Sequence, residues 1–225
     1  METLENIDIN LDLGEIGRQL HIEGEGDCSE VKRLVEIAQP LITGRAVYRV
    51  CYIDEKLEDA VTINGVRLTS RVLRKNLDNV GRVFPYAVTI GNQLEEKISE
   101  CKDLLEKYYL DTIGNIALVK TRKCLEDRLQ SGYAIDGMSF MGPGSLKDWP
   151  IEEQRNLFSI LGDTEASIGV RLNESLLMIP RKSVSGIYFP TEITFYSCQL
   201  CHRERCEGRK ARYNEKLARE YGIFK

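Results

Sequence analysis

Residues 82–90 read Arg-Val-Phe-Pro-Tyr-Ala-Val-Thr-Ile, and Gly91 and Asn92-Gln93-Leu94-Glu95 follow them. The run is apolar, β-branched and aromatic, which predicts a buried strand. Asn92 and Glu95 have the spacing of a capping box, so a helix is expected directly after the strand. The residues expected on its buried face are Leu94, Ile98, Cys101, Leu104, Leu105 and Tyr108. A buried strand leading into an amphipathic helix indicates a sheet packed by helices.

Segments on both sides of this unit alternate between strand and helix patterns. Strands are expected at 46–53, 61–63, 166–172, 176–179, 186–189 and 193–196. Helices are expected after a capping box at 27–30, at 70–77, through 113–129 and at 211–221. Asn64-Gly65 predicts a tight turn, and Asp148 is expected to cap a helix with Trp149 and Pro150 in its first turn. The pattern favours an α+β fold with an antiparallel sheet packed by helices.

Composition and charge narrow the class of protein. The chain has 225 residues, 42% of them hydrophobic and 29% charged, which is typical of a globular protein. No apolar run approaches the roughly 18 residues that span a bilayer, and the acidic N-terminus does not resemble a signal peptide, so no membrane association and a cytoplasmic location are expected. A net charge of −4 disfavours nonspecific nucleic-acid binding. With only His21 and His202, the sequence argues against a hydrolytic triad, and no catalytic residue is predicted.

A glycine- and proline-rich loop is the first candidate binding element. Gly142, Pro143, Gly144 and Ser145 precede the helix expected after Asp148. Such a loop could present backbone N–H groups to an anion or a polar cofactor. The alternative is a tight connection between two elements. The loop lacks the Gly-x4-Gly-Lys-Ser/Thr pattern, so phosphate-loop nucleotide hydrolysis is not expected.

Glu174 is a second candidate, because it lies between apolar segments where an ionised carboxylate is costly to bury without a partner. It could recognise a cationic or amino group of a ligand, or it could pair with Arg171 or Arg181. Ser185 and Tyr188 add polar groups on the following strand, unless they face solvent.

The cysteines include a cluster near the C-terminal end of the sequence. Seven cysteines are an odd number, which argues against a full disulfide framework. Cys28, Cys51, Cys101 and Cys124 are dispersed and are expected to be core residues. The spacing of Cys198, Cys201 and Cys206 predicts an iron–sulfur cluster or a zinc ion, with His202 as the nearest further zinc ligand. Unmetallated or redox-active thiols are the alternative. Residues 198–225 hold eight Lys/Arg against four Glu, so we expect a Cys-rich basic tail after a domain at 1–197.

Several motifs, in order, resemble the activation domain of vitamin B12-dependent methionine synthase, particularly its stand-alone forms. They lie between about Val83 and Tyr188. The motifs are Ala87–Gly91, Pro143-Gly144, Asp148-Trp149-Pro150 with Glu152-Glu153-Gln154, Asn173-Glu174-Ser175, and Met178–Gly186. The family's methyl-donor motif is Arg-x-Ser-Pro-Gly-Tyr. Phe140 stands here in place of its arginine and Ser145 in place of its tyrosine.

The resemblance implies an activation-domain-like fold over residues 1–197 and a role in rescuing an oxidised corrinoid. Family members hold S-adenosylmethionine beside the Co(II) corrinoid of a corrinoid-binding protein or methyltransferase, and flavodoxin or ferredoxin supplies an electron. A cluster at the cysteines could deliver the electron instead. Two other functions remain open on the sequence: a non-catalytic module that docks on a corrinoid protein, and a zinc-stabilised nucleic-acid binder.

Overall fold

Strand β6 (Arg82–Thr89) is the central strand of the sheet, and its residues after Arg82 are all buried. The computed structural model describes residues 1–21, 25–206 and 208–223, with the backbone alone for 25–28. One edge of β6 pairs with β2 (Gly44–Tyr48) and then with β3 (Cys51–Lys56), and the other edge pairs with β10 (Ser183–Pro190). All three pairings are antiparallel. The buried strand predicted at 82–90 is confirmed.

The sheet extends outward from these strands. Strand β1 (Glu2–Ile7) pairs with β2, β4 (Ala60–Ile63) pairs with β3 and with β5 (Val66–Thr69), and β7 (Met138–Met141) pairs with β10. Within the described residues these strands form one eight-stranded sheet, and β8 (Arg171–Leu172) and β9 (Met178–Ile179) form a separate pair. The predicted α+β fold with an antiparallel sheet packed by helices is confirmed.

The strand predicted at 46–53 is divided in two by Pro85 on the facing strand. The N–H of Arg49 donates to the carbonyl of Pro85 at 3.0 Å. Proline has no N–H to donate in return, so the ladder is interrupted opposite it. Strand β2 therefore ends at Tyr48 and β3 begins at Cys51.

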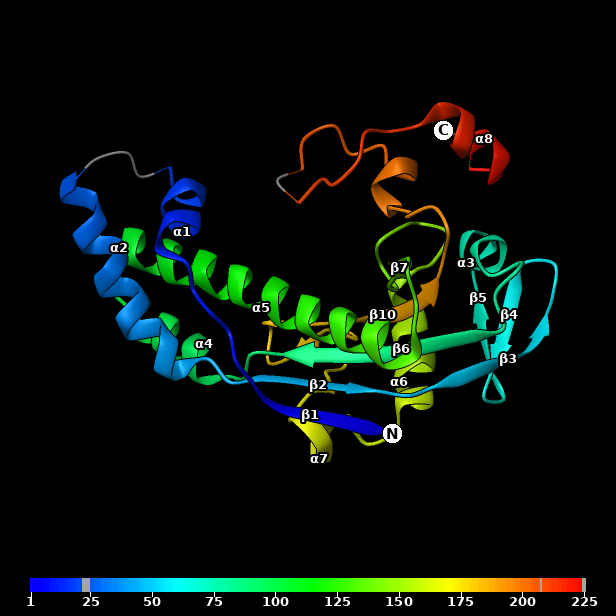
Figure 1. The fold of residues 1–225 in the computed structure, drawn as a ribbon, viewed down its shortest axis with the longest axis horizontal. Coiled ribbons are helices and arrows are strands. Elements are labelled where there is room, and N and C mark those ends of the chain that lie inside the picture. The colour runs from blue at the N-terminus through cyan, green and yellow to red at the C-terminus, as the bar shows by residue number, and fades with distance from the viewer. Residues whose placement is uncertain (22–24, 207, 224–225) are drawn as a thin grey trace.

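Helix α5 (Leu104–Tyr133) lies along one face of the sheet, as Figure 1 shows. Its residues Leu125 and Leu129 pack with Phe84 and Tyr188, whose side chains point to that face. The N-terminal half of α5 packs instead against a group of helices at one end of the sheet (Figure 1). These helices are α1 (Leu13–Gln19), α2 (Glu25–Ala38) and α4 (Gln93–Glu100).

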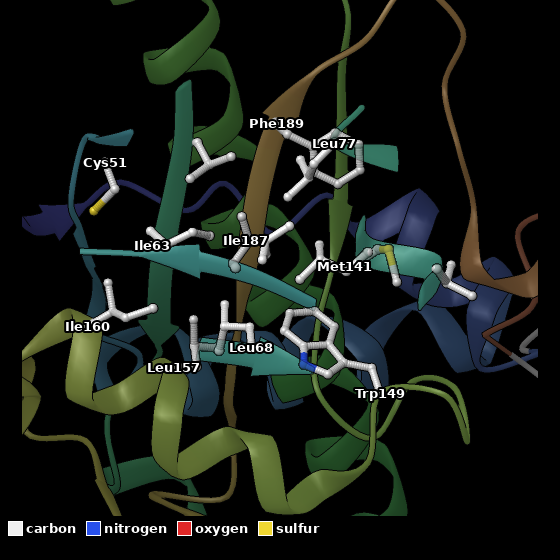
Figure 2. Packing of buried hydrophobic residues seen from close by; sticks show 14 of the residues in the cluster. Cys51, Ile63, Leu68, Leu77, Met141, Trp149, Leu157, Ile160, Ile187 and Phe189 are labelled. Atoms are coloured by element: carbon white, nitrogen blue, oxygen red, sulfur yellow. The ribbon is translucent and has the colours of Figure 1, made fainter. Parts of the chain in front are cut away.

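The opposite face of the sheet carries the second large core (Figure 2). Alternate residues such as Ala87 and Ile187 point to it, as the period of a strand requires. Helices α3 (Arg71–Asn76), α6 (Gln154–Leu161) and α8 (Glu215–Glu220) pack against it. Leu200 and Ala218 of the C-terminal segment are buried in this same cluster, with Trp149. The boundary after residue 197 stays a prediction.

The helix after β6 differs from the prediction. Asn92 makes no side-chain capping bond, and its amide donates to Glu96 instead, so the capping box is not formed. Helix α4 ends at Glu100, and a new helix begins because the Asp103 carboxylate accepts the N–H groups of Leu105 and Glu106. Leu94 is fully buried as expected, but after this new start the side chains of Leu104, Leu105 and Tyr108 face outward, and Leu104 is 80% exposed.

The bounds of several other helices and strands also differ from the prediction. Residues 166–168, at the start of the strand predicted at 166–172, belong instead to helix α7 (Thr164–Ile168), because Asp163 accepts the N–H of Ala166 and caps a helix there. No strand is formed at 193–196, and a 3-10 helix, Ser197–Leu200, follows. Helix α8 starts only after Asn214, which caps it. Helix α2 begins at Glu25, and the side chains of Asp27 and Cys28 lie outside the described residues.

The helix at 70–77 and the turn at 64–65 are confirmed. Ser70 caps α3, and Val72, Leu73 and Leu77 are fully buried. Within the described ranges, no helix combines the length and the apolar character that crossing a bilayer requires.

Candidate functional site

A pocket of about 880 Å³ lies between the 142–148 loop and the C-terminal segment. Its size is in the range of small-molecule sites. Aromatic and aliphatic side chains form much of its wall: Phe140, Leu146, Phe195, Leu200 and Ile223. Four cations also line it, namely Arg71, Lys147, Arg203 and Lys210, against one carboxylate, Asp148. The pocket therefore suits a ligand with an apolar body and an anionic group.

The glycine-rich loop lines this pocket but uses its own N–H groups internally. The N–H of Gly144 donates to the carbonyl of Trp149 at 2.7 Å, and the N–H of Ser145 donates to that of Gly142 at 3.2 Å. The Ser145 hydroxyl donates to the Gly142 carbonyl as well. Gly142, Gly144 and Ser145 line the pocket, and Pro143 lies between them in the chain. Of the two alternatives for this loop, these bonds favour the tight connection over an anion-binding cradle.

Gly142 is required by packing. A Cβ placed on it would lie 2.7 Å from the carbonyl oxygen of Ser185 on β10. Gly144 has a φ of +80°, which favours glycine in the turn. The two glycines thus allow the chain to turn directly after β7 while it stays close to β10. This turn places the 142–148 loop along the pocket.

Asp148 caps a helix other than the one predicted. Its Oδ2 accepts the N–H of Val72 at 2.9 Å and the hydroxyl of Ser70 at 2.5 Å, at the start of α3. Arg71 lies 3.6 Å from its other oxygen. The carboxylate is held here because the adjacent Trp149 is fully buried in the core, among residues of β5, β7 and α6 (Figure 2). The prediction that Asp148 caps the following helix is wrong.

A buried charged network lies behind the pocket wall at Phe140. Arg122 of α5 is 8% exposed and donates to the Tyr188 hydroxyl at 2.8 Å, and Glu126 lies 3.5 Å from its Nη1. The Arg122 guanidinium is 4.1 Å from the centre of the Phe140 ring, and the Lys210 ammonium is 5.6 Å from it. Burial raises the pKa of Tyr188 and, with nearby Arg122, lowers that of Lys210. Two cations therefore flank one aromatic ring of the pocket.

The sequence reasoning missed both cations. Arg122 falls on the helical face of Ala117, Leu125 and Leu129, where a charge among apolar positions was a usable signal. Lys210 carried no such signal, because its place in the pocket depends on how the C-terminal segment folds back.

Ser185 and Tyr188, predicted to bind a cofactor, lie inside the protein rather than on the pocket wall. The Ser185 hydroxyl accepts the amide of Gln154 at 2.6 Å and is buried. Tyr188 is fully buried and bonded to Arg122. Both residues support the loop from behind, and a direct contact with a ligand stays a prediction.

Glu174 is exposed, so the expected burial of this carboxylate is wrong. It lies in the turn between β8 and β9, where the Asn173 side chain accepts the N–H of Leu177 at 2.9 Å. The flanking strands have two residues each, which is too short to cover the turn. Arg171 pairs with Glu165, and Arg181 pairs with Glu95, so neither predicted partner is paired with Glu174.

The three clustered cysteines line the same pocket. Cys198 and Cys201 are half-buried, whereas Cys206 is exposed. In the part of the chain that the structure describes, no group of three or more His, Cys, Asp or Glu side chains is placed to hold a metal ion. The described geometry therefore does not fit zinc or an iron–sulfur cluster, and metal binding by these residues stays a prediction. Of the dispersed cysteines with described side chains, Cys51 is buried as expected, but Cys101 is half-buried and Cys124 is exposed.

Sheet, helices and pocket together define an α+β protein whose candidate ligand site lies between a β-hairpin loop and its C-terminal segment. Residues 143–214 match the family described as "Vitamin B12 dependent methionine synthase, activation domain". The resemblance found in the sequence is thereby confirmed over this region. No curated protein matches the chain significantly.

A solved structure has the same fold. It is the crystal structure described as the MetH reactivation domain bound to AdoHcy, and it is 16% identical with a TM-score of 0.61. The alignment covers 99% of this chain and 86% of that chain. The described residues thus share the fold of that reactivation domain. The family match at 143–214 also contains most of the pocket wall, from Gly144 to Lys210.

Proposed function

We propose that this protein is an accessory factor for the reductive activation of a corrinoid protein. The observation that carries the proposal is the coincidence of the activation-domain match at 143–214 with the wall of the pocket. The pocket would hold S-adenosylmethionine beside the corrinoid of a partner methyltransferase. Holding donor and acceptor in reacting geometry converts a bimolecular methyl transfer into a nearly unimolecular step.

The residues around Phe140 support this ligand. The family's arginine is absent at position 140, but Arg122 and Lys210 place two cations beside the aromatic ring that replaces it. A carboxylate next to the ring would meet their combined positive charge, and an adenine or ribose would meet the apolar wall of Leu146 and Phe195. S-Adenosylmethionine supplies the methyl group when bound; the protein's residues bind, orient and shield it.

The partner would be a corrinoid-binding methyltransferase, with a flavodoxin or ferredoxin as the electron source. In this proposal electron delivery is assigned to that external protein. The exposed cations of the C-terminal segment, such as Arg203 and Arg212, offer complementary charge to an acidic partner surface.

Calorimetric titration of the full chain with S-adenosylmethionine tests the donor site. Lys210→Ala should weaken binding about tenfold, the equivalent of about 1.4 kcal/mol. The matched control is Lys216→Ala, an exposed lysine on α8 that does not line the pocket. If both variants bound S-adenosylmethionine as tightly as the parent protein, the proposal that the donor binds in this pocket would be wrong.

The activation step is tested with a purified Co(II) corrinoid protein and reduced flavodoxin, by following the visible spectrum of the corrinoid. The proposal requires faster loss of the Co(II) spectrum only when this protein and S-adenosylmethionine are both present. If the protein binds the corrinoid partner but not the donor, it is a docking module that controls access to the cobalt, and the proposed activation role fails.

A further inference from the structure

Two of the pocket cysteines lie near the start and at the end of one helical turn. Cys198 lies in the 3-10 helix Ser197–Leu200, and Cys201 caps its C-terminal end in an extended conformation, with its N–H donating to the Cys198 carbonyl at 3.3 Å. A turn closed by such an i→i+3 hydrogen bond brings its two end Cα atoms to within about 7 Å of each other. Disulfides join Cα atoms about 4.4–6.8 Å apart. The backbone therefore holds these two residues within bridging reach.

One guanidinium bonds the carbonyls of both cysteines of the turn. Arg209 donates to the carbonyl of Cys198 at 3.3 Å through Nη1 and to the carbonyl of Cys201 at 3.3 Å through Nη2. Its two other contacts, to the Ala211 carbonyl at 3.1 Å and to the Arg203 carbonyl, tie the following chain to the same point. This arrangement orders the backbone on which both thiols stand, which lowers the entropic cost of joining them.

The two thiols also share an accessible and polar environment. Both line the pocket, and the Cys198 Sγ accepts the backbone N–H of Lys210 at 3.5 Å. Cys51, Cys101 and Cys124, in contrast, do not line the pocket, and the Cys101 thiol donates to the Asp103 carbonyl at 3.5 Å.

We propose that Cys198 and Cys201 form a reversible dithiol–disulfide pair in the wall of the pocket, with Cys206 outside it. The oxidant is a low-molecular-weight disulfide. A thiolate of the pair attacks the reagent, whose S–S bond breaks, and the second thiolate displaces the remaining half. One protein S–S bond forms, two small-molecule thiols leave, and they take up the two protons of the protein thiols.

Oxidation would remove both thiols from the pocket wall and lock the turn that carries them. A soft metal could then no longer use these sulfurs, because only thiolates are ligands. The pair does not depend on corrinoid activation. Its detection by covalent linkage is therefore independent of the proposed function, and either proposal can fail alone.

The test uses the full chain, equilibrated anaerobically with mixtures of glutathione and glutathione disulfide, quenched with acid and alkylated with N-ethylmaleimide. Trypsin gives peptide 183–203 with Cys198 and Cys201 together, and peptide 206–209 with Cys206 alone. The expected product is peptide 183–203 lighter by two hydrogens and not alkylated, while Cys124 stays fully alkylated. Reversal by excess glutathione should restore the alkylated peptide.

Serine variants assign the bond. Cys198→Ser and Cys201→Ser leave one thiol in peptide 183–203, which should be recovered alkylated or as a reversible glutathione adduct, whereas Cys206→Ser should leave the yield of intrapeptide disulfide unchanged. Far-ultraviolet circular dichroism of each variant checks that the fold is kept. Stable glutathione adducts on Cys198, a bond to Cys206, or full alkylation of peptide 183–203 at high glutathione disulfide would each overturn the proposal.

Discussion

The carboxylate of Asp148 accepts the backbone N–H of Val72 at 2.9 Å, although the two residues lie 76 positions apart. The pocket loop is thereby fastened to the start of α3, and the Ser70 hydroxyl, itself buried, donates to the same oxygen. A loop residue and a helix terminus satisfy each other, so the position of the loop depends on a helix from the first half of the chain.

Replacing Asp148 with alanine should lower the free energy of unfolding by about 2–3 kcal/mol, because the Ser70 hydroxyl and the Val72 N–H lose their shared acceptor. Urea unfolding measures the change. Asp136→Ala, at an exposed position, is the matched control and should change stability by less than about 0.5 kcal/mol. Equal effects of the two variants would contradict the capping role.

Gly142→Ala should destabilise the protein by about 2–4 kcal/mol, because the added Cβ would meet the Ser185 carbonyl and force β7 away from β10. Gly132→Ala is the control, since nothing lies within 4 Å of a Cβ there and the residue is in α5. This change should stabilise the protein by about 0.5–1 kcal/mol. Thermal unfolding of both variants measures these changes. A Gly142→Ala protein as stable as the parent would contradict the predicted clash with β10.

Tyr188→Phe removes the hydroxyl that accepts a hydrogen bond from Arg122. We expect a loss of about 1–2 kcal/mol of stability, because a buried guanidinium is left with one acceptor fewer. The same variant should shift Phe140 and weaken ligand binding in the pocket, since Arg122 lies against that ring. Unchanged stability would mean that the guanidinium is satisfied without Tyr188.

Tyr86 stacks on Tyr188 at 4.4 Å, but its buried hydroxyl has no hydrogen-bond partner of normal geometry among the described residues. Burial raises the pKa of Tyr86 to about 12. Because the folded pKa lies above the ordinary value near 10, the stability linked to this proton is full below about pH 10 and is lost as the pH rises towards 12. The stability of Tyr86→Phe relative to the parent should therefore be about 1 kcal/mol higher at pH 11 than at pH 8. Urea unfolding of the variant and the parent at pH 8 and pH 11 measures this difference, because all other titrating groups are common to both proteins. An equal difference in stability at the two pH values would contradict the prediction.

Leu104→Lys should leave stability within about 0.5 kcal/mol of the parent, because this side chain is 80% exposed at the start of α5. Leu110→Ala, two turns later and fully buried, should cost about 2–5 kcal/mol. A loss of stability with Leu104→Lys as large as that with Leu110→Ala would mean that Leu104 is buried, as the sequence pattern predicts.

Local signals predicted the elements that local chemistry decides. The strand at 82–90, the Asn64-Gly65 turn and the helix at 70–77 all formed as expected. The pattern failed where a distant or competing group intervened: Pro85 divided a strand on its neighbour, and Asp103 started a new helix inside a predicted one.

The site was less predictable than the fold, for the same reason. The pocket joins Arg71, Phe140 and Ile223, which no spacing rule connects. The loop at 142–145 and the cysteines did come together there, as candidates from the sequence. Glu174 did not become buried, because the strands beside it are too short, and this length is set by tertiary pairing rather than by composition.

Helix α5 belongs to two cores at once. Leu110 and Ile113 lie among the N-terminal helices, whereas Leu125 and Leu129 lie on the sheet. At about 1.5 Å per residue this helix is about 45 Å long, and neither core can open without exposing part of it. The helical end and the sheet should therefore melt as one calorimetric unit, with equal van't Hoff and calorimetric enthalpies.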